Sequence, residues 1–140
     1  MIEITDGDGK PVDTNGPHSS DGTRAIAAGI DEAMRMLNYA TMPGNDGLVY
    51  PSTVYSVYGE LAAALSKLPQ ALGQMERWIG ERAAAGEIRE NPDYGQHGGD
   101  LQAAHAALVA ATAEARTRAG LLSEALGRAR SAVSGLETLE

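Results

Sequence analysis

The sequence has no cysteine and no phenylalanine, and it holds a single tryptophan among its 140 residues. Without cysteine, the chain has no disulfide, no thiolate zinc site and no cysteine nucleophile. With so few large aromatic side chains, a core has to be built from aliphatic residues and from alanine runs such as 62–64 and 83–85. Alanine buries little apolar area, which stabilises by only about 25 cal/mol per Å². We therefore expect a modestly stable monomer that gains from association.

Long apolar runs and an excess of basic residues are also missing. No run approaches the roughly 18 apolar residues of a membrane span, and the N-terminus lacks the basic and apolar regions of a signal peptide. The net charge is −8, from 19 acidic and 11 basic residues. A nucleic-acid-binding protein normally has a basic face, and none is evident here. We expect a cytoplasmic protein that binds neither nucleic acid nor a membrane.

Residues 54–79 carry the clearest pattern in the chain. Apolar side chains recur there at alternating intervals of four and three residues, which is an unbroken heptad repeat. A strand, with its period of two, does not produce this spacing. The members of this stripe are Val54, Tyr58, Leu61, Leu65, Leu68, Leu72, Met75 and Ile79. A heptad stripe needs a partner helix, so the pattern predicts a second long helix in the chain.

The helix that contains this stripe is expected over residues 52–89. Pro51 suits a first helical turn, where its missing N–H costs nothing, and Ser52 or Thr53 can serve as local caps. Pro69 lies inside the helix, where a proline removes one hydrogen bond and clashes one turn back. Because the heptad phase is the same on both sides of this proline, we predict one helix kinked near Pro69. A full break at that position is the alternative.

The partner helix is expected over residues 100–135, after a glycine-rich loop at 91–99. Asp100 is placed to cap its first turn. Its apolar stripe is rich in alanine and contains Leu101, Ala104, Leu108, Ala111, Ala115, Ala119, Leu122, Leu126, Ala129, Val133 and Leu136. Both long helices span about 36 residues, or roughly 50–55 Å at 1.5 Å per residue. Equal lengths predict a long antiparallel hairpin.

A shorter helix is expected before the hairpin, over residues 22–41, with Ser20 or Asp21 as its cap. It has an apolar stripe of its own, formed by Ile26, Ile30, Ala33, Met34, Leu37 and Thr41. This helix is about half as long as the hairpin, so we expect it to cover only part of the hairpin surface. The uncovered part is the predicted partner surface.

The first 20 residues are rich in Gly, Pro, Asp, Asn and Ser, which is typical of a flexible acidic arm. Ile2 and Ile4 alternate with polar residues before an Asp-Gly-Asp-Gly turn, so a short hairpin is the alternative, marginal unless it packs on something. A calcium loop counted from Asp6 would need glycine at its sixth position, where the chain has Pro11. We therefore expect no calcium site in the arm.

No arrangement of residues in the sequence indicates a catalytic site or a cofactor. His97, Asp100 and His105 lie close in sequence, but they span a glycine loop and a helix start instead of the i, i+3 or i, i+4 spacing of helical metal ligands. Acidic and basic residues alternate along the helices, as on ordinary solvated faces. We expect no metal, no cofactor and no enzymatic activity.

The aromatic side chains are the strongest candidates for a partner interface. Tyrosines gather at the end of the first helix and at the start of the second, where they either pack the corner between the helices or contact a partner. Trp78 lies one position away from the heptad stripe, so core edge and partner contact are both open. The candidate interface consists of Tyr39, Tyr50, Tyr55, Tyr58, Trp78, Leu122, Leu126 and Val133.

Two resemblances bear on this interpretation. The segment 78–80, Trp-Ile-Gly, is similar to the Trp-x-Gly motif of the WXG100 family of small secreted helical hairpins, where the motif sits in the tight turn. The segments Leu-Asn-Tyr-Ala-Thr at 37–41, Tyr-Pro at 50–51, Val-Tyr at 54–55, Leu-Pro-Gln-Ala-Leu at 68–72 and Arg-Trp at 77–78 resemble small uncharacterised helical proteins of high-G+C actinobacteria. The second resemblance covers residues 24–136 and implies an actinobacterial source, with a mobile element or phage as one setting.

The sequence thus predicts an all-α protein with an arm at 1–20 and a helical bundle at 21–138. The predicted function is a non-enzymatic protein–protein interaction or assembly protein, most simply a homodimer or a partner of another helical protein. A WXG100-like secreted protein is one alternative, and a small-ligand or regulatory module at the tyrosine corner is another.

Overall fold

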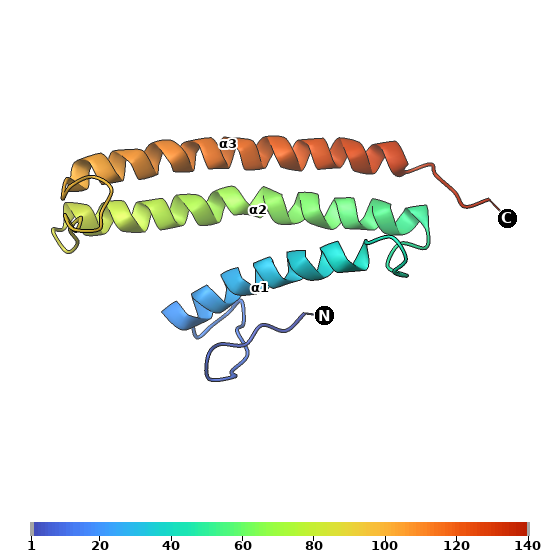
Figure 1. The fold of residues 1–140 in the computed structure, drawn as a ribbon, viewed down its shortest axis with the longest axis horizontal. Helices are drawn as coiled ribbons and strands as arrows, with labels where there is room; N and C mark the ends of the chain where they lie inside the picture. Colours follow the sequence, from blue (N-terminus) through green and yellow to red (C-terminus); the bar gives the residue numbers. More distant parts are fainter. Residues whose placement is uncertain (1, 140) are drawn as a thin grey trace. The chain divides into compact units, whose positions relative to one another are not determined.

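A computed structural model describes residues 2–139 of the chain and confirms the all-α fold. Three helices follow one another, α1 (Ser20–Ala40), α2 (Pro51–Ala84) and α3 (Leu101–Val133) (Figure 1). The chain divides into two compact units, Met1–Val49 and Tyr50–Glu140. The division therefore falls in the segment between α1 and α2, and not near residue 20, where the composition of the sequence changes.

In the N-terminal unit, the acidic arm follows the path of the short hairpin that was the alternative. Ile4 accepts a backbone hydrogen bond from Val12 at 2.8 Å, and the Asp6 carboxylate closes the turn by accepting from the N–H groups of Asp8 and Lys10 at 3.0 and 2.9 Å. The Ile4 side chain lies against α1, 3.0 Å from where a Cβ of Gly29 would be. The arm has contacts that fix its path, whereas its flexibility stays a prediction.

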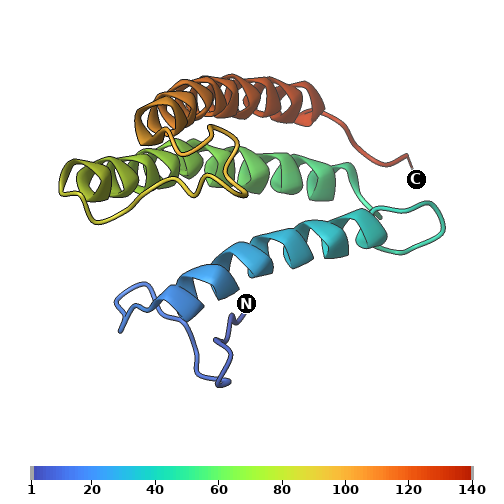
Figure 2. The ribbon, with the colours of Figure 1, turned by 60° about the vertical axis from the view of Figure 1, so that its left-hand side comes forward.

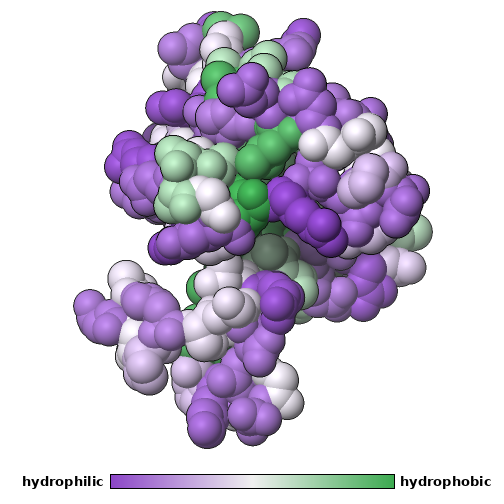
Figure 3. Space-filling model, turned by 90° about the vertical axis from the view of Figure 1, so that its left-hand side faces the viewer, coloured by the Kyte–Doolittle hydropathy of each residue, from purple (hydrophilic) through white to green (hydrophobic). Residues whose placement is uncertain are grey.

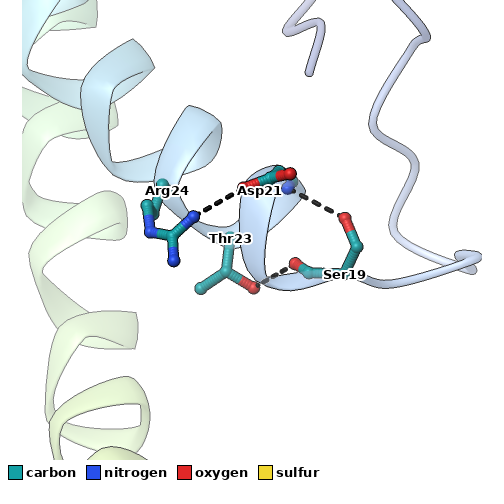
Figure 4. A network of polar contacts seen from close by, with 5 residues as sticks. Ser19, Asp21, Thr23 and Arg24 are labelled. Carbon is teal, nitrogen blue, oxygen red and sulfur yellow. Dashed lines mark hydrogen bonds and ion pairs between the residues drawn. The ribbon is translucent and has the colours of Figure 1, made fainter. Parts of the chain in front are cut away.

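Ser19 caps the start of α1, one residue before the predicted cap positions. Its backbone is extended, and its hydroxyl accepts from the N–H of Gly22 at 3.0 Å (Figure 4). The Thr23 hydroxyl donates back to the Ser19 carbonyl at 3.0 Å, and Arg24 pairs with Asp21 at 2.5 Å. The bond from Gly22 to Ser19 satisfies an N–H group that has no partner inside the helix.

We expect Ser19→Ala to weaken the first turn of α1 by about 1 kcal/mol, the usual value of an N-cap hydroxyl. Hydrogen exchange should show faster exchange of the amides of Gly22 and Thr23. Ser20→Ala is the matched control, because Ser20 lies inside the helix and its hydroxyl does not cap it. Equal exchange in the two variants would contradict the assignment of the cap.

In the C-terminal unit, α2 and α3 run antiparallel, side by side along their length (Figures 1 and 2). The predicted helical hairpin is confirmed. α2 passes through Pro69 as one helix, so a full break at that residue is wrong. Tyr50 precedes the helix with an extended backbone and makes no side-chain cap, and Pro51 stands in the first turn as expected.

α2 ends at Ala84, so its predicted extension to Arg89 is wrong. Gly86 follows with a φ of +70°, a left-handed conformation that glycine adopts without strain. The N–H of Gly86 donates to the Ala83 carbonyl at 3.1 Å, and that of Glu87 donates to the Arg82 carbonyl at 3.0 Å. These bonds use carbonyls that would otherwise lack a partner and end the helix at a defined place.

The loop at 85–100 is organised by the carboxylate of Glu90, whose side chain is only 10% exposed. One carboxylate oxygen accepts from the N–H of His97 at 2.7 Å, and the other accepts from the N–H of Gly99 at 2.5 Å. Asp100 then caps α3 by accepting from the N–H of Ala103 at 3.0 Å, as the sequence predicts. The loop therefore closes on itself and leads directly into α3.

Candidate interaction surface

The line along which α3 meets α2 is partly polar, although most of the expected stripe, including Leu108, Ala119 and Leu126, is buried or half-buried along it. Thr112 and Ala119 are buried on this line. Ser123 donates its hydroxyl to the Ala62 carbonyl of α2 at 2.8 Å. The contact line runs through Leu101, His105, Leu108, Thr112, Arg116, Ala119, Ser123, Leu126, Arg130 and Val133. Polar side chains thus occupy half of these positions.

Glycines on α2 make room for the long polar side chains of α3. A Cβ added at Gly59 would lie 3.0 Å from Nε of Arg130. One added at Gly73 would lie 3.4 Å from the guanidinium of Arg116, and one added at Gly80 would lie 3.1 Å from Nε2 of His105. The small residues recur at intervals of seven along α2, at Gly59, Ser66, Gly73 and Gly80. Sequence reasoning missed this repeat, although the interval of seven was visible in it.

Most members of the two apolar stripes are half-buried in the hairpin, but a few stay exposed beside the contact line. On α2, Leu68 and Met75 are 39% and 56% exposed. At 100° per residue they lie about two-fifths of a turn from the neighbouring small residues Ser66, Gly73 and Gly80. On α3, Ala111, Ala115 and Leu122 are exposed and lie about a quarter of a turn from its contact line. Because the helices are antiparallel, both rotations point to the same side of the hairpin.

We call this side the apolar face and define it by Leu68, Met75, Ala111, Ala115 and Leu122. The opposite side of the hairpin is a polar groove of about 1050 Å³, whose lining includes Gln70, Gly73, Arg77, His105 and Arg116. The two sides of the hairpin therefore differ in chemistry. Figure 3 looks onto the loop end of the hairpin, where hydrophobic residues reach the surface among hydrophilic ones.

The predicted interface tyrosines fall into both units. Tyr39 belongs to the N-terminal unit and is exposed, with the Arg35 guanidinium 5.8 Å from its ring centroid. Arg35 also donates to Glu32 at 2.7 and 2.8 Å, and this hydrogen bond lowers the pKa of the Glu32 carboxyl. In the C-terminal unit, Tyr50 is exposed, whereas Tyr55 and Tyr58 are half-buried.

Tyr55 is held within the hairpin by α3. The Arg130 guanidinium lies 4.2 Å from the centroid of the Tyr55 ring, within cation–π distance. The neighbouring Gly59 leaves the space through which Arg130 reaches the ring. Tyr55 therefore contributes to the contact between α2 and α3, a role that neither alternative stated for the tyrosines included.

Trp78 is 52% exposed on α2, with the Arg82 guanidinium 5.3 Å from its ring. Leu122 is exposed on the apolar face, whereas Leu126 and Val133 are half-buried along the contact line of α3. Trp78 and Leu122 are thus the members of the predicted interface on the hairpin that remain most open to a partner.

The Trp-Ile-Gly segment at 78–80 lies inside α2, and the turn of the hairpin comes later, at 85–100. It therefore does not have the position that the WXG100 motif occupies in its family. Within residues 2–139, no three His, Cys, Asp or Glu side chains come together as metal ligands. Over the same residues, none of the helices combines the length and apolar character needed to cross a membrane.

Comparisons of this chain with known protein families, with curated proteins and with solved structures each give no match.

Proposed function

We propose that this protein is a non-enzymatic interaction or assembly protein that self-associates through its helical hairpin. The observation that carries the proposal is the exposed apolar face. Ala119 is the one buried apolar side chain that the structure records among residues 2–139. Within the C-terminal unit, α2 and α3 have only each other as neighbours, and two helices alone cannot enclose a core.

The heptad pattern of α2 supports the same proposal. Leu68 and Met75 belong to an unbroken heptad stripe, yet both stay exposed within the hairpin. Heptad positions are stabilised when they insert between side chains of another helix. Burying such residues contributes about 25 cal/mol for each Å² of apolar surface removed from water. Leu68 and Met75 would therefore bury more apolar surface against a further layer of helices than they bury against α3.

Sedimentation equilibrium of the full chain over a wide concentration range tests this function. We expect the weight-average mass to rise with concentration from that of one 14.6 kDa chain to that of two. A mass that stays at one chain up to the highest concentration would contradict self-association. Size-exclusion chromatography with light scattering, repeated in high salt, should give the same mass, because an apolar contact does not weaken when charges are screened.

A further inference from the structure

We propose that Asn15 is a site of spontaneous covalent modification, at which the side-chain amide is converted to a carboxylate by reaction with the backbone nitrogen of Gly16. The reaction is intramolecular and takes its one co-reactant, water, from the solvent. Every group that takes part lies in the turn at 13–16 of the N-terminal arm. The inference is therefore independent of the proposed self-association.

The reaction has two steps. The Gly16 nitrogen attacks Cγ of Asn15, so that a new N–Cγ bond closes a succinimide ring, while the bond from Cγ to Nδ2 breaks. The proton that the Gly16 nitrogen loses leaves with Nδ2 as ammonia. Water then opens the ring at one of its two carbonyls, which gives aspartate or isoaspartate. Because the attacking nitrogen and Cγ belong to adjacent residues, the first step gains the advantage of an intramolecular reaction.

The surroundings of the other three asparagines disfavour the same attack. Asn91 is followed by a proline, whose nitrogen has no proton to lose. Asn38 lies inside α1, where the next N–H is bonded along the helix. Asn45 donates its side-chain amide to the Tyr39 carbonyl at 2.6 Å, and the residue after it carries a side chain. The reaction is therefore selective for Asn15.

Asn15 meets the requirements that these asparagines do not. It is exposed, and its side chain makes no hydrogen bond with any residue from 2 to 139. Gly16 has no Cβ that would shield the attacking nitrogen from Cγ. The side chain of Asn15 can therefore reach this nitrogen without giving up a contact of its own.

One backbone hydrogen bond restrains the attacking nitrogen. The N–H of Gly16 donates to the Asp13 carbonyl at 3.1 Å, and this bond has to open before the nitrogen can react. Exposed turns open at a lower free-energy cost than packed helices, because few contacts break with them. The turn therefore slows the reaction without preventing it.

The products change the turn. Both place a carboxylate beside that of Asp13, which accepts from the N–H of residue 15 at 2.9 Å. Like charges at such short range repel one another. Isoaspartate also adds a carbon to the main chain before Gly16, so the bond from Gly16 to the Asp13 carbonyl cannot re-form as it was. Modification should therefore leave the turn open.

Tryptic peptide mass spectrometry of the full chain, incubated at physiological temperature and mildly alkaline pH, tests the site. Because Lys10 precedes a proline, trypsin yields a peptide of residues 1–24, in which Asn15 is the sole amide side chain. The peptide of residues 36–67 contains Asn38 and Asn45 and is the internal control. We expect conversion of amide to acid at least about tenfold faster in the first peptide, a barrier lower by about 1.4 kcal/mol.

A variant and a second condition make the test decisive. Asn15→Gln should keep its amide, because its longer side chain has to close a larger ring. Equal conversion in the two peptides would overturn the proposal, as would an acid product that contains no isoaspartate, since direct hydrolysis gives aspartate alone. Conversion at Asn15 in the urea-unfolded chain, with none in the native chain, would mean that the turn blocks the reaction and would also overturn it.

Discussion

Glu90→Ala should destabilise the C-terminal unit by about 3 kcal/mol. Its carboxylate is nearly buried and accepts hydrogen bonds from the N–H groups of His97 and Gly99. A hydrogen bond to a charged group contributes about 1.5–3 kcal/mol, and the substitution removes the acceptor of two N–H groups in the loop. The loop that connects α2 to α3 would lose the group that closes it. Urea denaturation, followed by circular dichroism at one fixed protein concentration, measures the change.

Two variants separate this effect from a general loss of negative charge. Asp93→Ala removes a carboxylate from the same loop, where the exposed side chain accepts no hydrogen bond, and should change stability little. Glu90→Gln keeps the shape and one acceptor oxygen, so it should fall between the other two. A Glu90→Ala variant as stable as Asp93→Ala would refute this role for Glu90.

The regular parts of the fold follow from local pattern. The spacing of the apolar residues in the heptad stripe by itself predicts α2. Asp100 precedes α3 at the position where a carboxylate caps a helix. The glycine loop at 91–99 likewise marks where a helix cannot continue, whereas the prediction ran through Gly86, just after the end of α2. Local pattern therefore predicts the helix types, their order and the hairpin.

The contact between the helices does not follow from the same pattern. We expected an apolar stripe of α3 to face α2, yet His105, Arg116 and Ser123 lie among the residues that do so. Glycines of α2 accommodate His105 and Arg116, and that requires matching residues more than 20 positions apart. An apolar stripe shows which side of a helix avoids water. It does not show whether the covering surface belongs to the neighbouring helix or to another molecule.

The contacts of the arm and of Glu90 were missed for a similar reason. Composition indicates flexibility in the arm, but the packing of Ile4 beside Gly29 depends on α1. Glu90 looks like an ordinary surface residue until the loop brings the amides of His97 and Gly99 to it. In both places, the contact that fixes the local structure joins residues that are not linked by a helical or strand repeat in the sequence.

Ala119→Leu should destabilise the hairpin by about 1–3 kcal/mol, the usual cost of forcing extra methylene groups into a packed site. Ala119 is 6% exposed and lies on α3 between Arg116 and Ser123, which both contact α2. Leucine and alanine have similar helix propensities, so α3 itself should form as before. The added bulk would instead push α3 away from α2 and lengthen the 2.8 Å hydrogen bond from Ser123 to the Ala62 carbonyl.

Ala110→Leu is the control, because it makes the same change on the same helix at an exposed position. It should leave the denaturation midpoint unchanged, whereas Ala119→Leu should lower it and speed hydrogen exchange along the middle of both helices. Equal midpoints would mean that the helices do not approach closely at Ala119. The polar contact line of α3, and with it the exposure of the apolar face, would then lose its support, because both follow from the way α3 is turned at this residue.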